Sequence, residues 1–236
     1  MALIFSDDLE RAAGEFWLPT DDPPGPWTSY GKTSGGTMLV SVTDPLSGDA
    51  SGYLDHAGLN VGANLRFDSV GNLAEAWSGM TVKAQTLTRG SADLFWVVCG
   101  FYTAGLARQL GAAIIRDTGP GATWHARYWE GSSKIFDSTI AIATGVSYVV
   151  EQHLVIGAGT GLFQVWIDGV LIINLTGLTN NGNTIDELYI LQNSQAADQH
   201  VTGQWDDLQV ATSRLYPPSY LYAHRRSARI IGANQI

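Results

Sequence analysis

The strongest structural signal in the sequence is residues 161–175, GLFQVWIDGVLIINL, where an Asp-Gly pair separates two apolar, β-branched runs. Asp-Gly is a preferred sequence of the two-residue type I′ turn. These residues therefore predict a β-hairpin with positive φ at both turn residues, Asp168 and Gly169. The turn also sets the register of the hairpin, which predicts that Trp166 lies opposite Leu171.

Both faces of this hairpin are apolar, which is unusual for an antiparallel sheet. Side chains alternate along a strand, so the predicted core face carries Phe163, Val165, Ile167, Val170 and Ile172, with Val165 opposite Ile172. The other face carries Trp166, Leu171 and Ile173. A soluble protein rarely leaves such a patch exposed, so these three side chains are predicted to be covered by a loop, a neighbouring subunit or a ligand.

The rest of the chain has the pattern of an all-β protein, with 27 glycines and 8 tryptophans among 236 residues. Short apolar runs alternate with Gly-rich turns, which is typical of a sandwich. Residues 47–62 are rich in small and polar side chains and are predicted to form a long loop. The organisation predicted is one domain, residues 1–212, followed by a C-terminal extended arm, residues 213–236. Strands are predicted at 27–30, 37–42, 64–67, 80–88, 94–102, 112–116, 123–129, 134–137, 147–156, 162–167, 170–175, 187–192 and 204–211.

Charge argues against several classes of partner. The net charge is −9, which disfavours general binding to nucleic acid or to an anionic membrane. No apolar run is long enough to span a bilayer, and the N-terminal residues lack the pattern of a secretory signal. Residues 219–236 contain three arginines and no acidic residue, so this arm is predicted to dock on an acidic surface of another subunit or particle protein. The arm residues expected to make that contact are Tyr220, Tyr222, Arg225, Arg226, Arg229 and Ile230.

Three motifs in order resemble the concanavalin A-like lectin/glucanase superfamily, in its laminin G-like branch. They are YVVE at 148–151, FQVWIDGV at 163–170 and WDDLQV at 205–210, and FSDD at 5–8 looks like the first strand of such domains. The resemblance implies a two-sheet antiparallel jelly-roll sandwich. Domains of this style that start without a signal peptide are similar to structural and tail-associated proteins of tailed bacteriophages. The resemblance therefore implies a non-enzymatic structural or surface protein of a phage-like particle, assembled in the host cytoplasm.

Such a protein would act through contacts with other particle proteins or with copies of itself, and could adhere to a cell-surface glycan. The first alternative is a carbohydrate-binding, lectin-like module. The second alternative is a polysaccharide lyase or glycoside hydrolase, which would bring His125, Arg127 and His153 into one cleft. The paired-carboxylate motif of the superfamily's glucanases, E-x-D-x-x-E, is absent, as are the Arg-x-Glu-Leu-Arg and Gln-Ile/Val-His motifs of its alginate lyases. The protein is therefore predicted not to be an enzyme. The residues expected to contact a glycan or partner are Trp166, Leu171, Ile173, His125, Arg127, Trp129 and His153.

Few residues suit a metal or a disulfide. The single cysteine, Cys99, lies in an apolar run and is predicted to be a buried small hydrophobe. No Cys/His spacing suits zinc, and no cofactor is expected. The resemblance leaves one ion to consider, a structural Ca²⁺ held by Asp7, Asp8 and Asp206 if the first and last strands pair.

Overall fold

The computed structural model describes residues 3–7, 27, 29–32, 36–42, 46, 51–57, 62–68, 70–119, 121–193 and 198–214. Over these residues the regular elements are fifteen β-strands and one short 3-10 turn, η1 (Ala104–Leu106). No helix in this part of the chain is long and apolar enough to cross a membrane.

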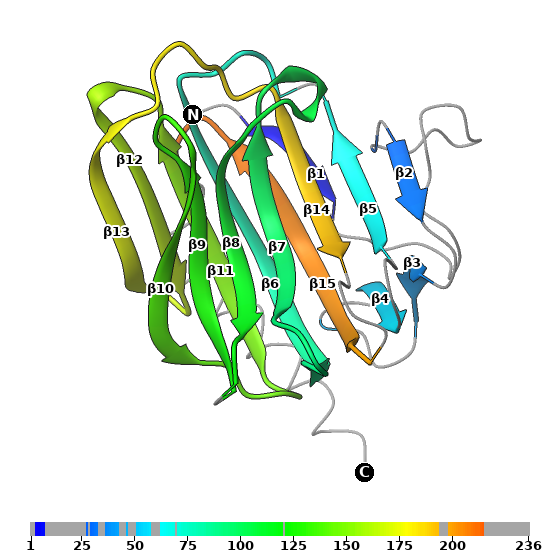
Figure 1. Cartoon of the computed structure of the whole chain (residues 1–236). Coiled ribbons are helices and arrows are strands. Elements are labelled where there is room, and N and C mark those ends of the chain that lie inside the picture. The colour runs from blue at the N-terminus through cyan, green and yellow to red at the C-terminus, as the bar shows by residue number, and fades with distance from the viewer. Residues whose placement is uncertain are drawn as a thin grey trace, which may run out of the picture.

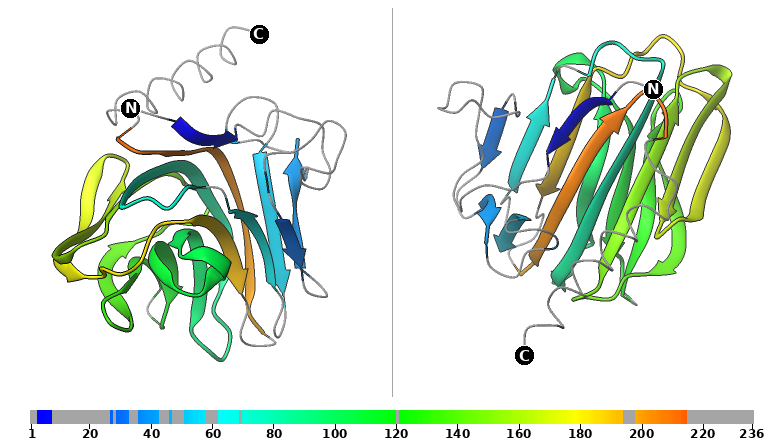
Figure 2. Two further views of the ribbon diagram at one scale, coloured as in Figure 1. Left: turned by 90° about the horizontal axis from the view of Figure 1, so that it is seen from above. Right: turned by 180° about the vertical axis from the view of Figure 1, so that it is seen from behind.

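The strands form two antiparallel sheets, called sheet A and sheet B, that pack face to face. Sheet B lies in front in Figure 1, and sheet A lies in front in the right-hand view of Figure 2. The predicted all-β jelly-roll sandwich is therefore confirmed. Across sheet A the strands are β13 (Val170–Thr179), β12 (Ala158–Ile167), β11 (Ser147–Val155), β6 (Glu75–Thr88), β15 (His200–Ala211), β4 (Ser51–Ala57) and β3 (Gly36–Ser41), and β1 (Leu3–Asp7) also pairs with β15. Across sheet B they are β10 (Ser133–Ala141), β9 (Ala122–Trp129), β8 (Gln109–Asp117), β7 (Leu94–Tyr102), β14 (Glu187–Asn193), β5 (Gly62–Phe67) and β2 (Ser29–Lys32).

The core lies between the two sheets and contains large aromatic side chains from both. A buried polar link crosses it, because the Gln152 side-chain oxygen of sheet A accepts a hydrogen bond from the Ala113 amide of sheet B at 2.8 Å. The Gln152 side-chain amide donates to the Ser78 hydroxyl at 3.2 Å. Cys99 is buried beside this serine, as predicted, and burial raises the pKa of its thiol to about 12. The thiol is therefore neutral and serves as a small core side chain.

The predicted β12–β13 hairpin is present. Asp168 has φ 50° and Gly169 has φ 79°, which confirms positive φ at both turn residues. Trp166 pairs with Leu171 as predicted, but an irregularity in the ladder then pairs Val165 with Ile173. The shift turns Ile173 into the core, where it is 1% exposed, so the prediction that it shares an outer patch with Trp166 and Leu171 was wrong.

Replacing Gly169 by valine should lower the free energy of unfolding by about 1–3 kcal/mol, because a β-branched residue is strained at positive φ. Chemical denaturation of the full chain measures this change. Gly169→Asn is the matched control, since asparagine tolerates the left-handed region and should cost clearly less. Equal stability of the valine and asparagine variants would contradict the argument.

The prediction of a loop over residues 47–62 was wrong, because β4 lies there and pairs with both β3 and β15. The small residues that suggested a loop have a packing reason instead. A Cβ atom added at Gly52 would lie 2.2 Å from Cε2 of the buried Trp205 ring, so only glycine fits against this ring.

Candidate functional site

The outer face of sheet B carries the candidate site. One cross-strand row on this face runs from Arg127 through Ala112, Gly100 and Tyr189 to Arg66, on β9, β8, β7, β14 and β5. Neighbouring strands are about 4.8 Å apart, so Arg127 and Tyr189 start about 14 Å from each other. The two residues between them have the smallest side chains in the row, so the space over the middle strands is open to side chains from neighbouring positions.

Tyr102 and Gln109 border this space, because they end β7 and begin β8 on either side of η1 and pair across the two strands. A Cβ atom added at Gly100 would lie 3.0 Å from the Tyr102 ring and 3.2 Å from the Gln109 amide nitrogen, so both groups lie over this glycine. Gln109 is buried, and its side-chain amide lies against the Tyr102 phenol and lowers the pKa of that phenol. By hydrogen-bond geometry, however, neither atom of the amide has a partner among the described residues. A buried amide without a partner is costly, so its presence points to an external ligand.

Two tyrosines lie side by side at this position, with the ring centroids of Tyr102 and Tyr189 5.4 Å apart. Burial raises the pKa of Tyr102 well above its ordinary value, and the Arg127 guanidinium offsets part of that rise. Burial also raises the pKa of Tyr189, and Arg66 opposes this shift. At neutral pH both phenols are therefore mainly protonated and can donate hydrogen bonds or protons.

The turn that joins Tyr102 to Gln109 is held by two carboxylates from the start of β14. Asp186 accepts a hydrogen bond from the Ala104 amide at 3.2 Å, and Glu187 accepts one from the Gly105 amide at 2.5 Å. Glu187 is 2% exposed and forms an ion pair with Arg66 at 2.7 Å. These contacts fix the turn and with it the relative positions of the tyrosine and the glutamine.

The site contains positive charge that no carboxylate of the described residues neutralises. The described part of the chain holds six arginines, Arg66, Arg89, Arg108, Arg116, Arg127 and Arg214. Four of them lie within 4.0 Å of a described carboxylate, and Arg108 and Arg127 do not. Arg127 donates to the Ser133 hydroxyl at 3.0 Å, while Arg108 donates to the Asn183 side chain at 2.9 Å and lies 5.1 Å over the Trp129 ring. Both guanidiniums are therefore available to an anionic ligand near Gln109.

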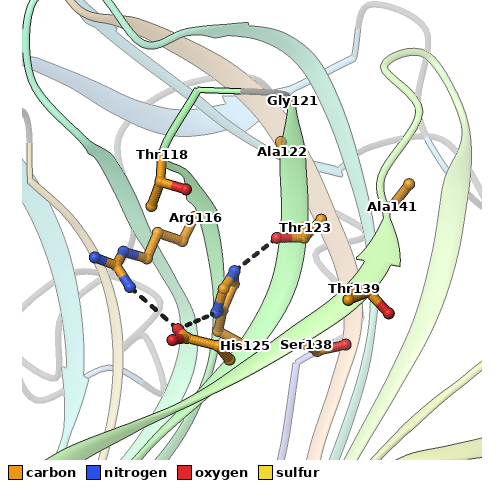
Figure 3. Close-up of a pocket in the computed structure, with 10 residues that line it drawn as sticks. Arg116, Thr118, Gly121, Ala122, Thr123, His125, Ser138, Thr139 and Ala141 are labelled. Atoms are coloured by element: carbon orange, nitrogen blue, oxygen red, sulfur yellow. Dashed lines mark hydrogen bonds and ion pairs between the residues drawn. The ribbon is translucent and has the colours of Figure 1, made fainter.

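A pocket of about 600 Å³ opens on the same sheet face, between β8, β9 and β10 (Figure 3). Within it His125 Nδ1 lies 3.0 Å from Asp137 and Nε2 lies 2.6 Å from the Thr123 hydroxyl. Burial lowers the pKa of His125, and Asp137 opposes that shift. The neutral ring then donates from Nδ1 to the carboxylate and accepts the threonine proton at Nε2. Arg116 reaches the same carboxylate at 3.1 Å.

The predicted contact residues divide between the two sheets. His125, Arg127 and Trp129 lie on β9 of sheet B, whereas His153, Trp166 and Leu171 belong to β11, β12 and β13 of sheet A. His153 therefore does not share a cleft with His125 and Arg127. This division could not be predicted from the sequence, because alternation shows which face of a strand is polar and not which sheet the strand joins.

The sheet A residues form a closed cluster of their own. Trp77 stacks on His153 at 3.8 Å and on Trp166 at 5.4 Å, and the Arg214 guanidinium lies 4.8 Å over Trp166. Arg214 also makes a two-pronged ion pair with Glu151, at 3.1 and 2.6 Å. Trp166 is thus covered from within the chain and is 9% exposed, while Leu171 is 40% exposed.

The predicted calcium site remains a prediction. β1 does pair with β15, which places Asp7 opposite Leu208, and Asp206 is buried and accepts a hydrogen bond from the Asp207 amide. Asp8 lies outside the described residues. Within the described ranges, no group of three or more His, Cys, Asp or Glu side chains is arranged to hold a metal ion. The predicted arm residues, from Tyr220 to Ile230, also lie outside the described part of the chain.

Four residues of the site were missed from the sequence: Tyr102, Arg108, Gln109 and Tyr189. Tyr102 ends a strand that is apolar throughout, so it was grouped with the core. The available signal was the polar turn TAGLARQ directly after this strand, because residues on either side of a short turn become neighbours in a sheet.

Comparison with known proteins identifies similar folds. No family model matches the sequence, and no curated protein is similar to it in sequence. Among solved structures, an endo-β-1,4-glucuronan lyase from the fungus Trichoderma reesei matches with a TM-score of 0.62 and 11% identity over 86% of this chain and 96% of that one. The cellulose-induced protein Cip1 matches with a TM-score of 0.61 and 16% identity over 89% of this chain and 98% of that one. Alginate lyase Aly36B, as a variant bound to an alginate tetrasaccharide, matches with a TM-score of 0.62 and 15% identity over 89% of this chain and 97% of that one.

These comparisons agree with the two-sheet jelly-roll fold and correct the functional prediction. They give no support for phage structural proteins or for the laminin G-like branch. The prediction of a non-enzymatic particle protein was wrong by this comparison, because two of these three structures are polysaccharide lyases. The second alternative, a polysaccharide lyase or hydrolase, agrees better with these structures.

Proposed function

We propose that this protein is a polysaccharide lyase that cleaves a polymer containing uronic acid on the outer face of sheet B. The observation that carries the proposal is the set of unsatisfied groups at one place. Arg108 and Arg127 lack carboxylate partners among the described residues, and they lie near the unpartnered amide of Gln109 and the paired phenols. Cations and an amide donor suit a carboxylate, and neutral phenols suit proton transfer.

The first step is recognition of the uronate. The Arg127 guanidinium and the Gln109 side-chain NH₂ are donors that can bind its carboxylate. Neutralising this carboxylate acidifies the C–H bond next to it, because the negative charge that develops on proton removal is delocalised onto the carboxylate oxygens. Trp129, held beneath Arg108, offers an aromatic surface for a neighbouring sugar ring.

The second step is elimination. The phenolate form of Tyr189 accepts the proton from the carbon next to the carboxylate, the glycosidic C–O bond breaks, and the Tyr102 phenol protonates the departing oxygen. The products are an unsaturated uronate and a shortened chain. A proton then passes from Tyr189 back to Tyr102, whose ring lies 5.4 Å away, and this restores the starting state.

Replacing Arg127 by glutamine should lower kcat/KM by about 10²–10³-fold, because one charged donor to the developing anion is lost. The measurement is the ultraviolet absorbance of the unsaturated product, on a panel of uronic-acid polymers with the full chain. Lys83→Gln is the matched control and should keep near-normal activity, because it also removes one positive charge but lies on β6 of sheet A, away from the site. Binding of these polymers without cleavage would contradict the lyase and would favour a carbohydrate-binding module.

A further inference from the structure

The pocket in Figure 3 adjoins the proposed uronate site. His125 in the pocket and Arg127 at the site are two residues apart on β9 and point to the same side of the sheet. Two residues along a strand span about 7 Å, so the pocket begins within the reach of one sugar unit from Arg127. A polymer bound at Arg127 can therefore place the next sugar in this pocket.

The charges of the pocket do not suit a second uronate. Arg116 is the cation that lines it, and its guanidinium already contacts Asp137 at 3.1 Å and Asp93 at 2.9 Å. Asp93 is in turn 3.8 Å from Arg89, so the two cations and the two carboxylates balance. A carboxylate entering the pocket would meet the Asp137 carboxylate, whose side chain is 72% exposed, without a cation left to pair with.

The remaining lining suits hydroxyl groups. Thr118, Thr123, Ser138 and Thr139 contribute hydroxyls, and the His125 ring is held neutral by burial. Both contacts to Asp137 use Oδ1, and within the described part of the chain no side chain bonds its Oδ2 atom. This oxygen can accept a hydrogen bond from a sugar hydroxyl.

We infer that this pocket binds an uncharged sugar residue, so that the preferred substrate is a mixed polymer in which uronate units are linked to neutral sugars. The inference rests on the proposed function for the neighbouring uronate site. An enzyme that acts on a polymer made of uronate alone would need a cation in this pocket to bind the second carboxylate.

The test compares cleavage by the full chain of three polymers: glucuronan, alginate, and a polymer in which glucuronate alternates with a neutral hexose. We expect kcat/KM on the mixed polymer to be at least about tenfold higher, the size of a binding preference set by one charged contact. Asp137→Asn frees Arg116 from one carboxylate. It should lower the ratio of kcat/KM on the mixed polymer to kcat/KM on the two homopolymers at least about fivefold. Asp55→Asn in sheet A is the matched control and should leave the ratio unchanged.

Equal or faster cleavage of the homopolymers by the parent chain would overturn the inference while the lyase proposal stands. If none of the three polymers is cleaved, the lyase proposal fails. The affinities of the same polymers, measured by calorimetry, then test separately whether the pocket binds an uncharged sugar. Tighter binding of the mixed polymer, with the preference reduced in Asp137→Asn, supports the pocket assignment. Equal affinities overturn it.

Discussion

Replacing Tyr102 by phenylalanine is expected to lower kcat by about 10²–10⁴-fold, with a much smaller change in KM. The phenylalanine ring keeps the packing against Tyr189 but cannot protonate the departing oxygen. Tyr148→Phe is the matched control, because the Tyr148 hydroxyl accepts a hydrogen bond from the Ala143 amide at 2.9 Å on a strand of sheet A. A Tyr102 variant with parental turnover would remove this residue from the reaction.

The pH profile of the parent chain tests the same assignment. Burial raises the pKa of both tyrosines, so only a small fraction of the pair holds the one phenolate that proton removal requires. Activity should therefore rise as pH increases from neutral, up to the limit set by stability. In Tyr189→Phe, which lacks the base, the residual activity should lose this steep rise, whereas a merely structural substitution would lower the curve without changing its shape. A parent profile that falls above neutral pH while the fold persists would contradict the paired-phenol mechanism.

Replacing Gly52 by alanine is expected to destabilise the fold by about 1–3 kcal/mol or more, because the added methyl group overlaps the Trp205 ring. Trp205 is 1% exposed and fixed within the core, so the ring cannot move aside at low cost. The measurement is the free energy of unfolding from chemical denaturation.

Gly79→Ala is the matched control for this prediction, since Gly79 also lies on a strand of sheet A and nothing comes within 4 Å of an added Cβ atom there. It should be neutral or slightly stabilising, because alanine restricts the unfolded chain. Similar effects of the two substitutions would show that the loss arises from glycine flexibility and not from contact with the ring.

Much of the fold could be predicted from local pattern. The Asp168-Gly169 turn and the strand that ends at Tyr102 were recognised because turn chemistry and alternation are properties of neighbouring residues. β4 was missed because Gly52 resembles a loop residue until its partner is known. That partner, Trp205, is 153 positions away in the chain, and no local pattern connects the two.

The sequence by itself determined the all-β class, the β12–β13 hairpin with its turn, and the burial of Cys99. Tertiary structure alone decided which polar residues meet. It separated His153 from His125 by placing β11 and β9 in different sheets, and it brought Tyr189 of the distant strand β14 into the same sheet as Gln109 and Arg127. The physical reason is that strand order follows from burial of the apolar core between the sheets, to which the polar site residues on the outer face contribute little. Which arginines lack a carboxylate partner, and therefore that the site carries unpaired positive charge, is likewise known only from the tertiary structure.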